Sequence, residues 1–174
     1  VDVGESARAV DGQAWRIELT NRYRLKDHFF SWASLTIGRA WREDAAFDFD
    51  QPFAVNVVGS WDFLPLWNVG IRYRYGRGLP YTPIDGAIYD GTRDRYDPVL
   101  GETNSARLPD YQKVDLHLER TLQARNWSLV AYGELWWVPP ANNVMYLAHS
   151  YDYSETATVA GPGFLPLLGL RAEI

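Results

Sequence analysis

Apolar and polar residues alternate along seven stretches of the chain. In the clearest stretch Val114, Leu116, Leu118 and Leu122 share one face, while polar and charged residues occupy the other. A period of two is typical of a β-strand with one apolar and one polar face. The alternation predicts strands at residues 15–26, 29–41, 53–63, 67–75, 114–122, 127–137 and 164–174.

The connections between these stretches alternate in length. Those at 26–27, 64–66 and 124–126 are short turns, whereas 43–51, 79–109 and 138–163 are longer. Short turns at one end and long loops at the other are typical of outer-membrane β-barrels, where the long loops are extracellular. Residues 1–13 are interpreted as an extracellular loop or a short edge strand, which leaves open an eighth strand at the N-terminus.

The polar face of nearly every predicted strand carries charged residues. Burying these in a dry core would cost several kcal/mol for each unpaired ion, so this face must meet water or partner charges. A soluble lipocalin-like barrel would have an apolar lumen and a charged exterior, whereas a membrane barrel turns its apolar face to lipid. The residues that we expect to face a water-filled lumen are Arg16, Glu18, Arg22, Arg72, Arg74, Asp115, His117, Glu119, Glu134, Arg171 and Glu173.

Aromatic residues make up 15% of the 174 residues, with eight Trp and eleven Tyr. Large amphipathic rings suit the interface between a membrane and water. They stand at both ends of the predicted strands, as the two aromatic girdles of a transmembrane barrel would. The mean hydropathy is −0.31, and no apolar stretch approaches the roughly 20 residues that a spanning helix needs, so any crossing must use strands. The fold class that follows is all-β, an antiparallel transmembrane β-barrel to which this chain contributes seven or eight strands.

Candidate chemistry is sparse. His117 beside Asp115 and Glu119 resembles a base oriented by a carboxylate, but no nucleophile accompanies it, which favours a ladder of charges in the lumen. The aspartates between Asp85 and Asp97 do not have the spacing of a calcium-binding hand loop. The three histidines are scattered, there is no cysteine, and the net charge of −5 does not favour nucleic acid. We therefore expect no enzyme activity, no cofactor, no metal and no nucleic-acid partner.

The long loops combine tyrosines with carboxylates and flexible glycines. Aromatic rings supply contact area at a small entropic cost, and carboxylates supply adaptable hydrogen bonds, a composition suited to recognition. An equally plain interpretation is that these residues pack loop against loop over the barrel mouth. The candidate ligand-binding residues are Tyr81, Asp85, Tyr89, Asp90, Asp94 and Tyr96.

Four motifs resemble the C-terminal third of TonB-dependent outer-membrane receptors. They are FDQPF (49–53), GLPYTP (78–83), NSARLPDYQKVDL (104–116) and the closing LPLLGLRAEI (165–174), and the similarity runs from about residue 14 to the end. Two places depart from that family: residues 136–140 read WWVPP instead of an Asn-rich stretch, and Ile174 replaces the more common Phe. The resemblance implies a 22-stranded barrel around an N-terminal plug that TonB pulls on to admit bulky solutes.

The resemblance implies that residues 14–174 are barrel strands without a plug domain. The expected function is a C-terminal barrel segment or split subunit of a TonB-dependent transporter in the bacterial outer membrane. Seven strands would leave two unpaired edges in hydrocarbon, so we expect another polypeptide to supply the remaining strands and the plug. The other expected partners are outer-membrane lipids and lipopolysaccharide. The alternative is a self-contained eight-stranded outer-membrane barrel that acts as scaffold, adhesin or narrow pore, because the length suits eight strands.

Overall fold

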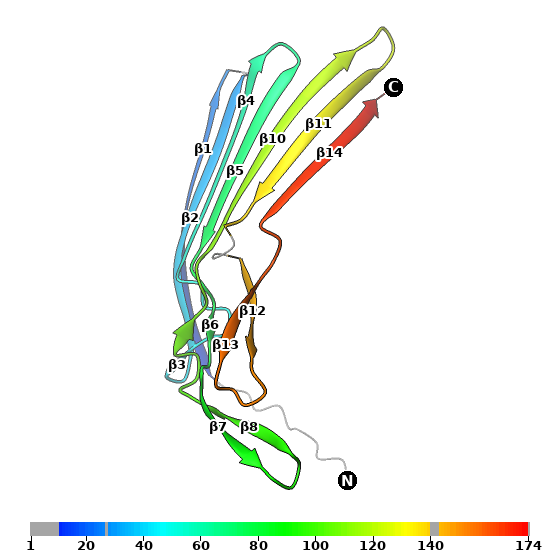
Figure 1. Ribbon diagram of the computed structural model, residues 1–174. Coiled ribbons are helices and arrows are strands. Elements are labelled where there is room, and N and C mark those ends of the chain that lie inside the picture. Colours follow the sequence, from blue (N-terminus) through cyan, green and yellow to red (C-terminus); the bar gives the residue numbers. More distant parts are fainter. Residues whose placement is uncertain (1–10, 27, 140–142, 174) are drawn as a thin grey trace, which may run out of the picture.

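The computed structural model describes residues 11–26, 28–139 and 143–173, and in these residues the chain is all-β. Seven long strands form one antiparallel sheet (Figure 1). In sheet order they are β1 (Gly12–Leu25), β2 (Phe29–Arg42), β4 (Phe53–Leu64), β5 (Trp67–Gly76), β10 (Tyr111–Gln123), β11 (Ser128–Trp137) and β14 (Phe164–Glu173). The seven predicted strands are therefore confirmed, each within about three residues at its start. In the described residues no helix is long and apolar enough to cross a membrane.

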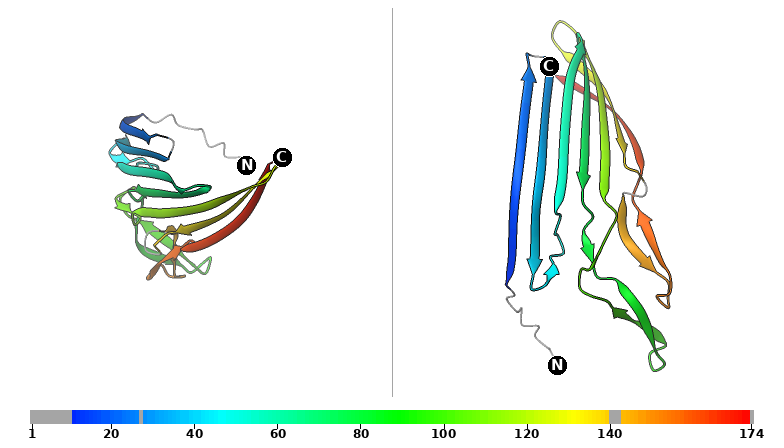
Figure 2. Two further views of the ribbon diagram at one scale, coloured as in Figure 1. Left: turned by 90° about the horizontal axis from the view of Figure 1, so that it is seen from above. Right: turned by 90° about the vertical axis from the view of Figure 1, so that its left-hand side faces the viewer.

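The sheet is strongly curved and open. Seen along the strands it forms a trough (Figure 2), and β1 and β14 are its two edges. The described residues therefore form a large antiparallel sheet and not a closed barrel. Of the predicted N-terminal loop or edge strand, Gly12 and Gln13 belong to β1, and residues 1–10 lie outside the described residues, as does Ile174.

Strand register places apolar residues beside apolar residues across all seven strands. Leu118, for example, pairs with Val69 on β5 and with Gly133 on β11, and Gly133 pairs with Leu168 on β14. Of these side chains, Leu118 is 45% and Leu168 91% exposed. The residues of this apolar face include Trp15, Ile17, Leu19, Tyr23, Leu25, Leu35, Ile37, Phe53, Val55, Val57, Trp61, Trp67, Val69, Ile71, Tyr73, Tyr75, Val114, Leu116, Leu118, Leu122, Leu129, Leu135, Trp137, Leu168 and Leu170.

The opposite face, called here the polar face, is the more crowded of the two. Its Ser34, Thr36, Lys113 and Val130 are the buried side chains of the long strands, glycines aside. Side chains converge on the concave side of a curved sheet and spread apart on the convex side. The burial therefore assigns the polar face to the inside of the trough and the apolar face to the outside.

The sequence predicted the long connections to be loops. In the structure they contain short strands of their own. β3 (Ala45–Ala46) pairs with the end of β2, and β6 (Pro80–Tyr81) pairs with β9 (Ala106–Arg107). Two hairpins, β7 (Ile84–Asp90) with β8 (Arg95–Leu100) and β12 (Val144–His149) with β13 (Thr156–Ala160), extend beyond one end of the sheet (Figure 1). The short turns all lie at the other end, as predicted.

Candidate functional site

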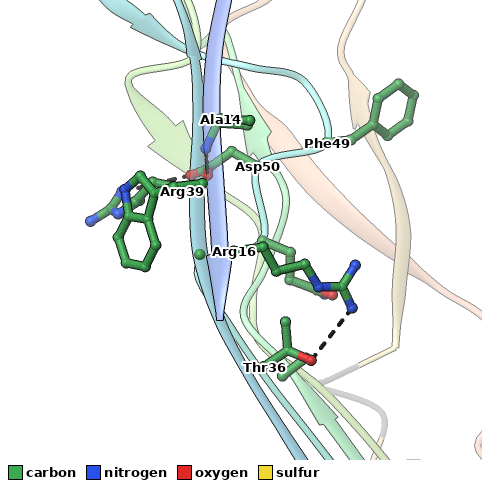
Figure 3. Close-up of a pocket in the computed structure, with 11 residues that line it drawn as sticks. Ala14, Arg16, Thr36, Arg39, Phe49 and Asp50 are labelled. Carbon is green, nitrogen blue, oxygen red and sulfur yellow. Dashed lines mark hydrogen bonds and ion pairs between the residues drawn. The ribbon is translucent and has the colours of Figure 1, made fainter. Parts of the chain in front are cut away.

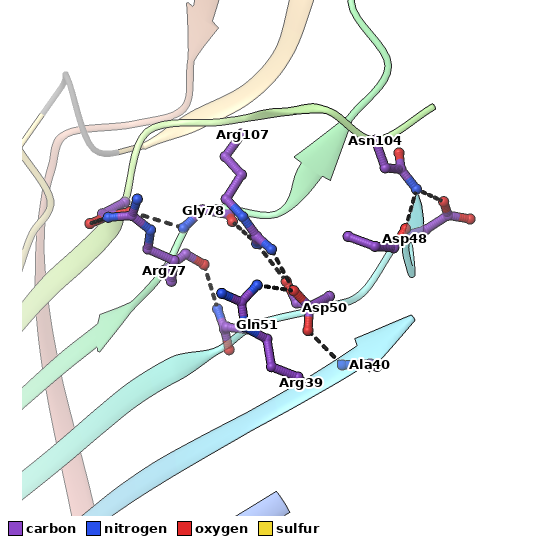
Figure 4. Close-up of polar contacts among 11 residues, drawn as sticks. Arg39, Ala40, Asp48, Asp50, Gln51, Arg77, Gly78, Asn104 and Arg107 are labelled. Atoms are coloured by element: carbon purple, nitrogen blue, oxygen red, sulfur yellow. Dashed lines mark hydrogen bonds and ion pairs between the residues drawn. The ribbon is translucent and has the colours of Figure 1, made fainter. Parts of the chain in front are cut away.

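A buried carboxylate joins three separate segments at the loop end of the sheet (Figure 4). Asp50 is 1% exposed, and its carboxylate pairs with the Arg107 guanidinium and lies 3.6 Å from the Arg39 guanidinium. The backbone N–H of Ala40 donates to Asp50 Oδ1 at 2.7 Å. Arg107 also donates to the carbonyl oxygens of Asp50 at 2.8 Å and of Gly78 at 3.0 Å. Two guanidinium groups and a backbone donor thus compensate the buried charge.

Further hydrogen bonds fasten the same segments to one another. The Asn104 side-chain amide donates to the Ala46 carbonyl at 2.8 Å and to the Asp48 carboxylate at 2.7 Å. The Asn104 backbone N–H donates to the Thr82 hydroxyl at 3.1 Å. Gln51 donates to the Arg77 carbonyl at 3.1 Å. We call Arg39, Asp50 and Arg107, with these surrounding bonds, the Asp50 cluster.

Asp110 holds the start of β10 against the end of β5. The Tyr75 hydroxyl donates to its carboxylate, the Gly78 backbone N–H donates at 3.1 Å, and the Arg77 guanidinium lies at 3.3 Å. The Tyr75 hydrogen bond, with smaller contributions from Gly78 and Arg77, lowers the pKa of Asp110. Gly78 fits here because a Cβ at this position would collide with the backbone carbonyl of Leu108.

Three of the four motifs quoted from the sequence meet in these contacts. FDQPF supplies Asp50 and Gln51, GLPYTP supplies Gly78 and Thr82, and NSARLPDYQKVDL supplies three partners in Asn104, Arg107 and Asp110. None of these residues was singled out as a site from the sequence. The sequence did show polar residues beside Pro and Gly in each motif. It did not show that segments 57 residues apart pair with each other.

A cluster of tyrosines joins the two long hairpins. The rings of Tyr89 and Tyr96 lie 5.1 Å apart, and Tyr151, from the β12–β13 turn, packs edge-on against Tyr96 at 5.5 Å. The Tyr89 hydroxyl donates to the Asp94 carboxylate at 2.6 Å, and the Tyr151 hydroxyl donates to the Asp94 backbone carbonyl. The Asp94 hydrogen bond raises the pKa of Tyr89. These four residues, the tyrosine cluster, bring loop against loop.

The other three candidate loop residues do not belong to the tyrosine cluster. Asp90 accepts from the Thr92 backbone N–H at 2.9 Å and pairs with Arg93 at 3.7 Å, so it shapes the β7–β8 turn. Asp85 lies against Gly101, the residue that follows β8. Tyr81 belongs to β6, where it pairs with Ala106. The structure therefore joins three of the six candidates, Tyr89, Asp94 and Tyr96.

Charged residues of the polar face pair across strands β5, β10 and β11. Arg74 donates to Asp115 at 3.2 Å, and Lys113 Nζ lies 2.8 Å from the same carboxylate and 3.8 Å from the centre of the Trp136 ring. His117 lies 3.2 Å from Glu119 and 3.3 Å from Glu134, and its ring stacks on Tyr132. The histidine thus bridges two carboxylates and has no nucleophile among these contacts.

The remaining polar-face residues named from the sequence take their places by register. Arg16 lies 3.7 Å from Glu18 on the same strand and donates to the Thr36 hydroxyl at 3.5 Å. Arg22 pairs with Trp32, Arg72 with Asp115, and Arg171 with Val130, each on a neighbouring strand. Glu173 pairs in register with Ser128. The other ten of the eleven residues therefore lie on the polar face, on five of the seven strands.

A hollow of about 380 Å³ opens where β1 and β2 meet the 49–54 segment (Figure 3). Arg16, Thr36 and Asp50 line it, and Phe49 stands at its rim with 72% of its surface exposed. The described residues contain no group of three or more His, Cys, Asp or Glu that could hold a metal ion. Comparison of the chain with protein families, curated proteins and solved structures found no match.

Proposed function

We propose that this chain is a C-terminal barrel segment or split subunit of a TonB-dependent outer-membrane transporter. The observation that supports this most strongly is the apolar face, which extends across all seven strands on the outside of the trough, opposite a charged inner face. Soluble monomers rarely expose contiguous apolar patches larger than a few hundred Å². A bilayer is the surrounding in which such a face is favourable.

Strand length supports the same proposal. A strand tilted by about 45° crosses a bilayer in about 9–11 residues. β1 and β2 each have 14 residues and β10 has 13, so these strands reach beyond the hydrocarbon. The β7–β8 and β12–β13 hairpins extend from the loop end of the sheet, which in this proposal is extracellular.

The open edges support a role as part of a larger barrel. β1 and β14 each present one row of backbone N–H and C=O groups that no described strand pairs. In hydrocarbon each unpaired group costs several kcal/mol, so strands from another polypeptide, which also carries the plug, complete the wall. The chain then contributes barrel wall and extracellular loops, and the solute pathway belongs to the assembly.

A pair of adjacent labels tests the membrane orientation. Leu118 and Glu119 lie on opposite faces of β10, so quenchers dissolved in the lipid phase should reach a label at Leu118 and water-soluble quenchers a label at Glu119. In addition, Leu118→Arg should destabilise the folded state by roughly 2–4 kcal/mol near the bilayer midplane, whereas Glu119→Gln should change it little. Aqueous quenching at Leu118 without lipid quenching would exclude the orientation.

Isolation of the protein from membranes tests the partner. We expect a second chain that carries a plug and further strands to co-purify. A folded monomer of this chain alone, with β1 paired to β14, would instead establish the self-contained barrel.

The extracellular hairpins are the proposed recognition element. Deletion of residues 85–97 removes most of β7, the turn and half of β8, and spares the β6–β9 pairing. Binding of a solute or partner protein should be lost while the heat-modifiable gel mobility of the folded barrel is kept. Unchanged binding would exclude this hairpin, and loss of the folded band would assign it a structural role.

A further inference from the structure

Two cations interrupt the apolar face within the described residues. Arg39 lies near the loop end of β2, and Arg120 lies near the short-turn end of β10. The described part of the face otherwise carries no charged residue, so something must compensate the positive charge of each arginine. An ion placed among apolar side chains at the edge of a bilayer is tolerated where it finds a partner charge or reaches the headgroup region.

The two arginines differ in how they are compensated. Arg39 lies 3.6 Å from the carboxylate of Asp50, so the protein supplies its counter-ion. Arg120 forms no ion pair with the described residues. Its guanidinium instead stands over the ring of Trp67, its register partner, with 5.2 Å from Cζ to the ring centre.

Trp67 is the end of a row of aromatic rings. Trp61 and Phe63 lie 6.1 Å apart between ring centres, and Phe63 and Trp67 lie 6.3 Å apart. Such rings favour the interface, where one edge meets acyl chains and the other meets water. The Arg120 side chain is exposed, and the row ends at it.

Arg120 lies close to the short turn between β4 and β5, where the proposed membrane orientation places the headgroup region. Its partner Trp67 is the first residue of β5, directly after the short turn, and the neighbouring Thr121 donates its backbone N–H to the turn residue Leu66 at 2.8 Å. An arginine on the lipid face is costly at the bilayer midplane but costs little near the interface. A guanidinium stacked on a ring keeps its edge N–H groups free to bind two phosphate oxygens at once.

We propose that Arg120, held on Trp67, binds the phosphate of a phospholipid headgroup in the leaflet on the short-turn side. The inference rests on the proposed function, because it requires the apolar face to meet lipid. It adds a specific lipid site to that function, with the headgroup phosphate as the counter-ion that the described residues do not supply.

Native mass spectrometry of the assembly extracted from membranes in mild detergent tests the site. The variants are Arg120→Gln, Arg120→Lys and the control Arg125→Gln, which removes a cation from the β10–β11 turn. A charge-assisted contact worth about 1.5–3 kcal/mol predicts that Arg120→Gln lowers phospholipid retention about tenfold or more. Arg120→Lys should retain less than the wild type and more than Arg120→Gln, and Arg125→Gln should match the wild type.

Several outcomes would overturn the inference. Retention by Arg120→Gln equal to that of the wild type excludes the site, and an equal loss in Arg125→Gln shows unspecific attraction of anionic lipid. Displacement of the phospholipid by inorganic phosphate at an equal concentration assigns a free-phosphate site. Heat-modifiable gel mobility checks folding, and if Arg120→Gln does not fold, Arg120→Lys decides by the same readout.

The label at Leu118 separates the two proposals. If lipid-phase quenchers reach Leu118 and the wild type retains no more phospholipid than Arg120→Gln, the headgroup site alone fails. If those quenchers do not reach Leu118, the membrane orientation itself fails.

Discussion

The Asp50 cluster and the tyrosine cluster lie at the same end of the sheet but are held together by different forces. Asp50 is fully buried, and charged donors from β2 and from the segment before β10 converge on it. The tyrosine cluster lies further out, where Tyr89 is 51% and Tyr151 66% exposed. It has ring contacts and two hydroxyl hydrogen bonds and no ion pair among its four residues.

Because of this difference, the Asp50 cluster is a fixed base for the loops and the tyrosine cluster is an adaptable tip. A buried carboxylate that loses a partner leaves an uncompensated charge, so the Asp50 cluster has one stable arrangement. Exposed rings and hydroxyls exchange protein partners for water at little cost, so the tyrosine cluster can rearrange. A loop that recognises a partner benefits from such a tip on a rigid base.

The largest effect is expected from Asp50→Asn. The neutral amide still accepts from Ala40 but leaves two guanidinium groups without their counter-ion. We expect a loss of about 3 kcal/mol in the free energy of unfolding, at the lower end for a broken buried ion pair because Arg39 is half exposed. Denaturant titration of the folded protein measures it.

The matched control is Asp48→Asn, two residues away. Asp48 is exposed and accepts one hydrogen bond from Asn104, so its loss should cost about 0.5 kcal/mol. Equal effects of the two substitutions would contradict the role of the buried Asp50 charge in holding the base together.

A smaller effect is expected from Tyr151→Ala, which removes the contact between the two hairpins. Loss of one edge-on ring pair and one exposed hydrogen bond should cost about 1 kcal/mol, confined to the tips. Amide hydrogen exchange should quicken at residues 89–96 and stay unchanged at residues 39–40 and 107. Faster exchange at the Asp50 cluster would show that the two clusters are coupled.

The smallest effect is a pH response of the tip. The pKa of Tyr89 is raised above its usual value near 10 by the hydrogen bond to Asp94. A raised folded pKa means that this contribution to stability is complete below pH 10 and is lost as the pH rises through the folded value. Ultraviolet titration of Tyr89 against Tyr89→Phe should show the late ionisation, and Asp94→Asn should bring it back toward 10.

The stability of the β12–β13 turn should instead depend on pH in the acidic range. Hydrogen bonds from Ser150 and Ser154 lower the pKa of Asp152 to about 2. A lowered folded pKa means that the contribution is present above the unfolded value near 4 and is lost as the pH falls through about 2. An Asp152 pKa near 4, measured by carbon-13 NMR, would contradict the turn geometry.

Alternation alone predicted the long strands because each has one apolar and one polar face over ten or more residues. It placed Leu118 and His117 on opposite faces correctly, and the register confirms this. The β7–β8 hairpin was missed although Asp90-Gly91 is a turn signal, because its strands are short and mixed in polarity. The partners of Asp50 could not be predicted, because nothing local in the sequence relates residue 50 to residue 107.

The two faces also carry residues that a strict alternation does not explain. Trp32 and Phe30 lie on the polar face of β2, opposite Arg22 and Arg24. The Arg24 guanidinium stands 5.8 Å from the centre of the Phe30 ring, so the ring is a partner for a cation and not part of an apolar core. Sequence reasoning assigns faces by average polarity and passes over such pairs.

The short pairing of β6 with β9 acts as a neck below the β7–β8 hairpin. Pro80 and Tyr81 meet Arg107 and Ala106 there, and Arg107 ties the neck to Asp50. Everything between residues 84 and 100 can therefore be lengthened, shortened or exchanged without altering the neck. Such a junction lets sequence diversify at the tip while the scaffold is inherited unchanged, and it marks residues 82 and 103 as the places to splice a foreign hairpin into this chain.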